Sequence, residues 1–303
     1  MSTERVDKAW QRKGLKEYSV ESILGTLGHY GLKVDEAGFR QLAEKLYPTG
    51  IAEEWQPRWK GTGQFAAFPR AAAEELWRRW LPDRLSPYTV AETLAKLMGS
   101  LGELLQGSQE AEVGPAFEAM DAVRKRVPLT PAGIPEEAFM HDALSLFDAQ
   151  AVRAFDNLAE MLARQGHMDD AESFADLEEF LLPERKGVAR SIVRVIKGER
   201  EPAIADLRQL AEDGSRGLPS RVLAVDALLH VGANSEAAGA GRPVLEAAEK
   251  AGDLHLALDM CARLQEAFKR LNDHGAQLAL QRDISRLEAA HEVAHPGHRH
   301  HRH

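Results

Sequence analysis

The sequence predicts an all-α protein, with an N-terminal helical bundle followed by an α-solenoid of about four helical hairpins. Composition is the first observation, because Ala, Leu, Glu and Arg are abundant helix formers while aromatic residues make up only 6% of the 303 residues. The second is that cap and turn signals divide the chain into stretches of helical periodicity. The third is a repeat in the C-terminal half. We expect a helical content above ~60% and negligible β-strand.

The N-terminal part, residues 1–130, is expected to form the bundle of short helices. All five tryptophans and all four tyrosines lie before residue 90. Trp77 and Trp80 are three residues apart and therefore share a helical face, which favours a Trp-rich core. The alternative is that these rings line a groove for a ligand or partner. Helix starts are indicated by capping residues at Ser19, Asp35 and Ser86.

A proline- and glycine-rich segment separates this part from the repeat. Pro128, Pro131, Gly133 and Pro135 fall within eight residues and indicate a linker. The repeat domain is accordingly expected over residues 136–293, with a disordered His-rich tail over 294–303.

The repeat is a glycine followed five residues later by an alanine. It occurs at Gly166/Ala171, Gly198/Ala203, Gly232/Ala237 and Gly252/Ala257. The glycine can end one helix in a left-handed conformation, and the small alanine lets the next helix pack closely. The helix pairs so defined begin near Val152, Lys186, Pro219 and Asp253, at spacings of 34, 33 and 34 residues. In this phasing the last Gly/Ala turn lies between two units rather than within one.

A period near 34 residues with two helices per unit resembles the tetratricopeptide repeat family. The first unit matches the family spacing best, at Phe155, Leu158, Ala159, Leu162, Gly166, Ala171 and Pro183. Glu178 departs from it, since the family favours a small residue there. The resemblance covers about residues 140–293 and implies stacked helical hairpins whose first helices line a concave wall that binds partner peptides.

Charge and cysteine content exclude several classes of protein. Acidic residues outnumber basic ones by 47 to 38, and the net charge of −9 disfavours nucleic-acid binding, which needs concentrated positive charge. The single cysteine, Cys261, allows no internal disulfide and is expected to be a small core residue. No apolar run approaches the ~20 residues of a membrane span, and residues 1–16 lack the apolar core of a signal peptide. We expect a cytoplasmic protein.

A possible metal motif lies near the end of the sequence. His291 and His295 fit the pattern H-E-x-x-H, in which two histidines bind zinc, and His298 and His301 extend it. Pro296 stops the helix directly after the second histidine, which argues against a protease. Two other interpretations remain: a flexible tract that chelates Ni, Cu or Zn adventitiously, or an incidental tail. No cofactor is expected.

A basic surface is the most suggestive feature of the repeat. Arg190, Arg194 and Lys197 share one face of a predicted helix, and Arg153 lies in the preceding unit. We expect this surface to bind an acidic peptide or a chain carboxylate. The alternative is a solvated helix face with local ion pairs. The acidic pair Glu178 and Glu179 is expected to be solvated in the same way.

Together these patterns predict a non-enzymatic scaffold or adaptor that binds a partner protein through the repeat surface. The alternative is a metal-dependent hydrolase or metal-binding protein that uses the C-terminal histidines. A third possibility is regulatory, with an effector role for the N-terminal bundle and a sensing role for the array.

Overall fold

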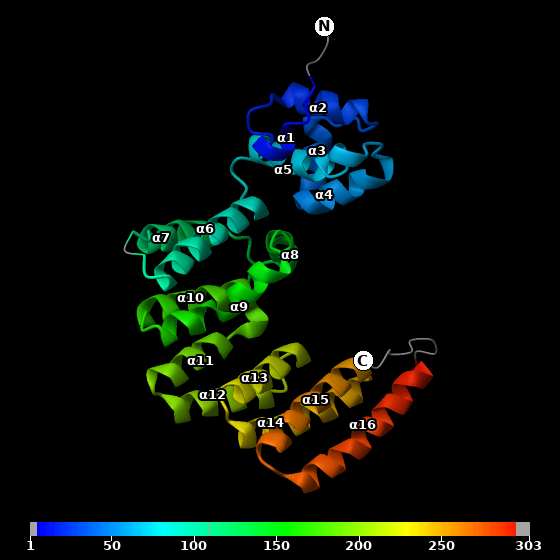
Figure 1. Cartoon of the computed structure of the whole chain (residues 1–303). Coiled ribbons are helices and arrows are strands. Elements are labelled where there is room, and N and C mark those ends of the chain that lie inside the picture. Colours follow the sequence, from blue (N-terminus) through cyan, green and yellow to red (C-terminus); the bar gives the residue numbers. More distant parts are fainter. Residues whose placement is uncertain (1–4, 109, 295–303) are drawn as a thin grey trace. The chain divides into compact units, whose positions relative to one another are not determined.

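The computed structural model describes residues 5–108 and 110–294. It is all-helical: sixteen α-helices bring the helical content to 74%, and the described residues contain no β-strand (Figure 1). The predicted all-α class and the helical content above 60% are confirmed. A lone antiparallel bridge joins Leu129 and Pro135.

The chain divides into two compact units, Met1–Phe155 and Asp156–His303. The division lies C-terminal to the proline-rich segment expected to be a linker. In that segment the Thr130 amide donates to the Ile134 carbonyl and the Glu136 amide to the Pro128 carbonyl, so the chain makes a tight turn. The helix that follows is attached to unit 1, because the Tyr47 hydroxyl donates to Glu136 and the Thr49 amide to Asp142.

The described residues of unit 1 contain eight complete helices. They are α1 (Trp10–Lys13), α2 (Val20–His29), α3 (Glu36–Ala43), α4 (Pro48–Trp55), α5 (Phe68–Trp80), α6 (Pro87–Leu105), α7 (Val113–Arg124) and α8 (Glu137–Leu144), with 3₁₀ turns η1 (Gln56–Arg58) and η2 (Gly63–Phe65). The three predicted caps are confirmed, since the side chains of Ser19, Asp35 and Ser86 accept backbone N–H groups at the starts of α2, α3 and α6.

A cluster of aromatic side chains forms the core of unit 1. Trp10, Trp55, Trp77 and Trp80 are buried in it, while Trp59 is half-buried at its edge. Trp10 packs edge-on against Phe68, and Trp80 packs edge-on against Phe39, with ring centroids 5.3 and 5.2 Å apart. The predicted Trp-rich core is therefore confirmed.

Unit 2 begins within α9 (Ala149–Arg164). It continues with α10 (Met168–Leu181), the 3₁₀ turn η3 (Pro183–Arg185), α11 (Val188–Lys197), α12 (Arg200–Glu212), α13 (Leu218–His230), α14 (Asn234–Ala251), α15 (Leu254–Arg270) and α16 (His274–Ala294). From α10 onward each helix packs against the next, and α11, α12 and α13 also contact the helix two places further along (Figure 1). This contact pattern is what stacked hairpins require.

The Gly/Ala repeat has the structural meaning that its spacing predicts. Its four glycines all have positive φ, between 74° and 101°, and its four alanines are fully buried. These turns connect α9 to α10, α11 to α12, α13 to α14, and α14 to α15. The turn between α15 and α16 has Asn272 at a φ of 56°, so an asparagine takes the left-handed position there. The irregular fourth Gly/Ala turn therefore connects two hairpins, and the last hairpin has its own turn.

Candidate functional site

Unit 2 contains a pocket of about 280 Å³ lined by α9, α10, η3, α11 and α13. Spacing of four residues places the lining side chains of each helix on one face: Asp156 with Glu160 on α9, and Asp226 with His230 on α13. Its apolar wall comes from Val188, Ala189, Ile192, Leu223 and Ala227. Four of the lining side chains are carboxylates, against one guanidinium and one imidazole. The pocket is therefore acidic.

Arg185 connects two of these carboxylates. It ends the turn η3, and its Nη1 lies 2.9 Å from Asp156 Oδ1 and 2.7 Å from Glu178 Oε1. Only 21% of its side chain is exposed, so both ion pairs are partly shielded from water. Arg185 thus links α10 to α9 across the pocket.

Glu178 is the least solvated charged group of the pocket. It is only 3% exposed; its Oε1 accepts from Arg185, whereas its buried Oε2 has no hydrogen-bond partner in the part of the chain that the structure describes. Burial raises the pKa of Glu178 to about 7, although the hydrogen bond and charge of Arg185 act in the opposite direction. The expectation that Glu178 is solvated is wrong. The residue that departs from the repeat pattern is the buried acid of the pocket.

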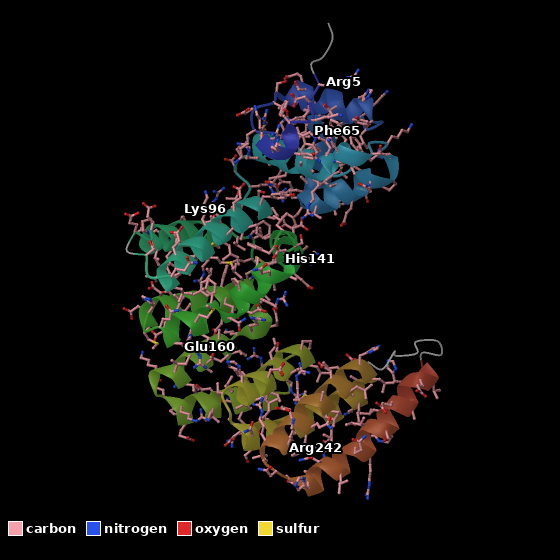
Figure 2. All side chains as sticks on the ribbon, viewed as in Figure 1. Arg5, Phe65, Lys96, His141, Glu160 and Arg242 are labelled. Carbon is pink, nitrogen blue, oxygen red and sulfur yellow. The ribbon has the colours of Figure 1, made fainter. Side chains whose placement is uncertain are left out.

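The other two carboxylates have partners at the pocket edge. Glu160 Oε2 lies 2.6 Å from His230 Nε2, and its Oε1 pairs with Arg164; Figure 2 labels Glu160. Asp226 receives a bidentate pair from Arg263 of α15, at 2.6 and 2.9 Å. These contacts fix the orientation of both acids, so the pocket presents preformed acceptors.

The predicted basic surface lies on another face of α11. The pocket-lining residues of α11 are Val188, Ala189 and Ile192. Each of the three cations pairs with acidic side chains of unit 2: Arg190 with Asp176 and Glu179, Arg194 with Glu199 and Asp206, and Lys197 with Glu172. Arg153 belongs to unit 1, where its Nε donates to the Ala149 carbonyl. The role of these four residues in binding a partner stays a prediction.

The predicted metal ligands are only partly placed. His291 is buried on α16, and its Nε2 lies 3.3 Å from Nε2 of His255 on α15. His295, His298 and His301 lie outside the described residues. Within residues 5–108 and 110–294, no group of three or more His, Cys, Asp or Glu side chains is placed to hold a metal ion.

Cys261 is a core residue, as predicted. It is 1% exposed within the apolar cluster of unit 2, and burial raises the pKa of its thiol to about 11. The thiol is therefore protonated at neutral pH and is a poor nucleophile.

Unit 1 contains a second pocket, of about 490 Å³, beside α1, α5 and α6. Glu74 lies in its wall. The Oε1 of Glu74 accepts from the Ser86 hydroxyl at 2.6 Å, its buried Oε2 has no hydrogen-bond partner among the described atoms, and burial raises its pKa to about 7. Four cations and three acids line this pocket, so its charge differs from that of the pocket in unit 2.

Neither the protein-family models nor the curated proteins contain a match to this chain. No helix in the described part of the chain is long and apolar enough to cross a membrane.

Proposed function

We propose that the protein is a non-enzymatic scaffold or adaptor whose C-terminal unit is a tetratricopeptide-like α-solenoid that binds a segment of a partner protein. The packing of successive helices, the positive-φ glycines of the Gly/Ala turns and the buried alanines that follow them support the solenoid. Such arrays expose an extended surface made from equivalent helices of successive hairpins. The pocket of unit 2 is formed mainly by α9, α11 and α13, which are the first helices of three hairpins.

The partner segment places a Lys or Arg side chain in this pocket. The observation that carries this proposal is the buried Glu178 Oε2 at the wall of an acidic pocket, an acceptor to which no donor in the described part of the chain is bonded. A buried unsatisfied acceptor is destabilising by roughly 1–3 kcal/mol, so a cationic donor from a partner removes that penalty and adds a charge-assisted hydrogen bond. The apolar wall of α11 suits the methylene stem of the same side chain.

The charge balance also favours a cation over an anion. An acidic peptide entering this pocket would meet four carboxylates, with Arg185 and His230 already paired to three of them. The acidic partner predicted from the sequence would have to bind at Arg190, Arg194 and Lys197 instead, where it must displace the acids of α10 and α12 that pair with them. It stays a separate prediction.

The experiment that tests the proposal uses the full chain and a panel of labelled peptides with matched length and hydrophobicity. One set carries Lys or Arg, and the other carries Glu in the same positions. Fluorescence anisotropy should show binding of basic peptides that weakens with added salt, because screening acts on the exposed part of the complex. The variant Glu178→Gln should bind at least tenfold more weakly, a loss of about 1.4 kcal/mol.

A matched control is Glu201→Gln, which removes one carboxylate from an exposed position of α12. It should bind basic peptides as the parent does. Thermal unfolding of both variants shows whether a loss of binding reflects a loss of folding. The proposal is wrong if acidic peptides bind better than basic ones, or if the two Gln variants bind basic peptides equally well.

The metal-dependent alternative depends on His291 together with residues outside the described part of the chain. It stays a prediction, and the hydrolysis of model peptides before and after treatment with a chelator tests it.

A further inference from the structure

The pocket of about 490 Å³ in unit 1 has a basic wall. Three of its cations lie on or just after α1 and the fourth lies on α5; they are Arg12, Lys13, Lys16 and Arg70. None of the four forms an ion pair in the described part of the chain, whereas the three cations on the basic surface of α11 are all paired with acids. The wall therefore presents positive charge that the fold does not use.

The three acids that line the same pocket offset this charge only in part. Glu75 already accepts hydrogen bonds from the guanidinium groups of Arg78 and Arg79. Burial raises the pKa of Glu74 to about 7, so this side chain is partly protonated at neutral pH. Glu92 is the third acid and is exposed. The lining therefore favours a negatively charged ligand.

Two further side chains of the wall suit an anion. Trp10 is only 7% exposed, and its indole Nε1 is a buried donor without a hydrogen-bond partner among the described residues. Arg70 donates from Nε to the Tyr88 hydroxyl at 3.1 Å and from Nη2 to the Ser145 hydroxyl at 3.2 Å. These neutral partners fix the guanidinium and leave its charge uncompensated. An anionic ligand supplies an acceptor for the indole and a counter-charge for the guanidinium.

The segment that carries the other cations is held against α5. Trp10 packs on Phe68 at the start of α5, and α1 lies beside that helix (Figure 1). Gly14 then turns the chain with a φ of 71°, and Arg79 Nη2 donates to the carbonyls of Leu15 and Lys16 at 3.2 and 3.0 Å. The basic wall is thus preformed, which lowers the entropic cost of binding a ligand.

We propose that the pocket of unit 1 binds a small organic phosphate, whose phosphate group pairs with the four cations and whose body lies against the apolar side chains of Ala67 and Ala71. A phosphate monoester carries about −1.5 to −2 charges at neutral pH and three acceptor oxygens, which suits four cations better than a single carboxylate does. The volume lies within the roughly 300–1,000 Å³ of small-molecule sites. The inference is independent of the proposed function, which concerns unit 2.

The probe is phenyl phosphate, titrated into the full chain at pH 7 by calorimetry. It should bind once per chain with a Kd below about 1 mM. Benzoate has the same ring with a single negative charge and should bind about tenfold more weakly, while the neutral benzyl alcohol should not bind measurably. Inorganic phosphate should also bind more weakly than phenyl phosphate, because it has no apolar body to place against α5.

The double variant Lys13→Gln with Lys16→Gln should bind phenyl phosphate about tenfold more weakly, because it removes two charge-assisted contacts. Both lysines are exposed, so we expect the fold to be retained, and thermal unfolding checks this. The matched control is Lys33→Gln with Lys45→Gln, which removes the same charge from exposed positions of unit 1 outside the pocket lining. It should bind phenyl phosphate as the parent does.

Three results would overturn the proposal. The first is that phenyl phosphate does not bind the parent. The second is that benzoate or inorganic phosphate binds as tightly as phenyl phosphate. The third is that the two double variants bind phenyl phosphate equally well, since the attraction would then come from the general charge of unit 1 and not from this wall.

Discussion

Each of the two compact units has, beside a pocket, a glutamate whose pKa is raised by burial, and these two glutamates have different surroundings. Glu74 and Glu178 both have a pKa raised to about 7 by burial, and each has one oxygen without a hydrogen-bond partner among the described residues. Glu74 is bound by a neutral hydroxyl, whereas Glu178 is bound by the guanidinium of Arg185. Burial is therefore the largest cause of both pKa shifts. The neighbouring charges decide what each pocket can bind.

The pocket of unit 1 is lined by slightly more positive than negative side chains, and the pocket of unit 2 by more negative ones. A cation entering the pocket of unit 1 would meet repulsion from Arg12, Lys13, Lys16 and Arg70. In unit 2 it would meet four carboxylates and a guanidinium already engaged by two of them. This difference favours unit 2 as the site for a cationic side chain, although both units contain a buried acid.

The largest expected effect comes from removing the cation of the Glu178 pair. Arg185→Met leaves a buried carboxylate without its ionic partner, and breaking such a pair is strongly destabilising. We expect the free energy of unfolding to fall by about 3 kcal/mol at pH 8. The corresponding change at Glu74, Ser86→Ala, removes a neutral hydrogen bond and a helix cap and should be destabilising by about 1–2 kcal/mol. Denaturant unfolding of both variants measures the difference.

A second change distinguishes loss of the ion pair from loss of packing at Arg185. Adding Glu178→Gln to Arg185→Met replaces the buried charge by a neutral group and should restore most of the lost stability. If the double variant is no more stable than Arg185→Met, the effect of Arg185 comes from its packing. The difference between Arg185→Met and Ser86→Ala then no longer compares an ion pair with a neutral hydrogen bond.

The pH dependence of stability should show both buried acids. Their pKa values are raised to about 7 from the ordinary 4.5, which means that the folded protein favours the protonated form of each acid. The resulting contribution to the free energy of unfolding is fully present below about pH 4.5 and is lost as the pH rises through 7. Glu178→Gln and Glu74→Gln should each become more stable relative to the parent between pH 5 and pH 8, by on the order of 2 kcal/mol. Tm measured across this range checks it. If the difference in Tm between one variant and the parent does not change with pH, the acid replaced in that variant has an ordinary pKa.

The pH dependence of binding should appear in unit 2 only. A basic peptide binds ionised Glu178, so its affinity should rise about tenfold from pH 6 to pH 8 as the carboxyl loses its proton. The Glu178→Gln variant should lose most of the dependence, whereas Glu74→Gln should retain it.

The sequence contains local signals for much of this fold. Ser19, Asp35 and Ser86 cap their helices because a side chain needs only the next few backbone amides to do so. The Gly/Ala turns are equally local, since a positive φ and a small contact residue both follow from residue type. The turn at Asn272 lacks the Gly signal, and asparagine tolerates the same conformation.

The candidate site could not be predicted in the same way, because it depends on residues that are distant along the chain. Glu178 departs visibly from the repeat pattern, which is the one signal that could have found it, but its burial depends on Arg185 and on the packing of α10. His230 meets Glu160 across 70 residues, and His255 meets His291 across 36. The face of α11 that carries Arg190 could be assigned from spacing. The acids opposite it could not, since they belong to α10 and α12.

The smallest expected effect on stability concerns that basic face, which contrasts with the pocket on the other side of the same helix. Replacing Arg190, Arg194 and Lys197 together by Gln removes exposed ion pairs that are individually worth little, so the free energy of unfolding should fall only slightly. Gln is preferred to Glu, because Glu would place like charges opposite Asp176 and Glu172.

Binding of basic peptides to this triple variant should be unchanged, since none of the three replaced residues lines the pocket of unit 2. If acidic peptides bind the parent but not the triple variant, this result supports the second, acidic partner predicted from the sequence. If the triple variant instead loses the basic peptides, the binding surface lies on the ion-paired face and the assignment of the pocket of unit 2 is wrong.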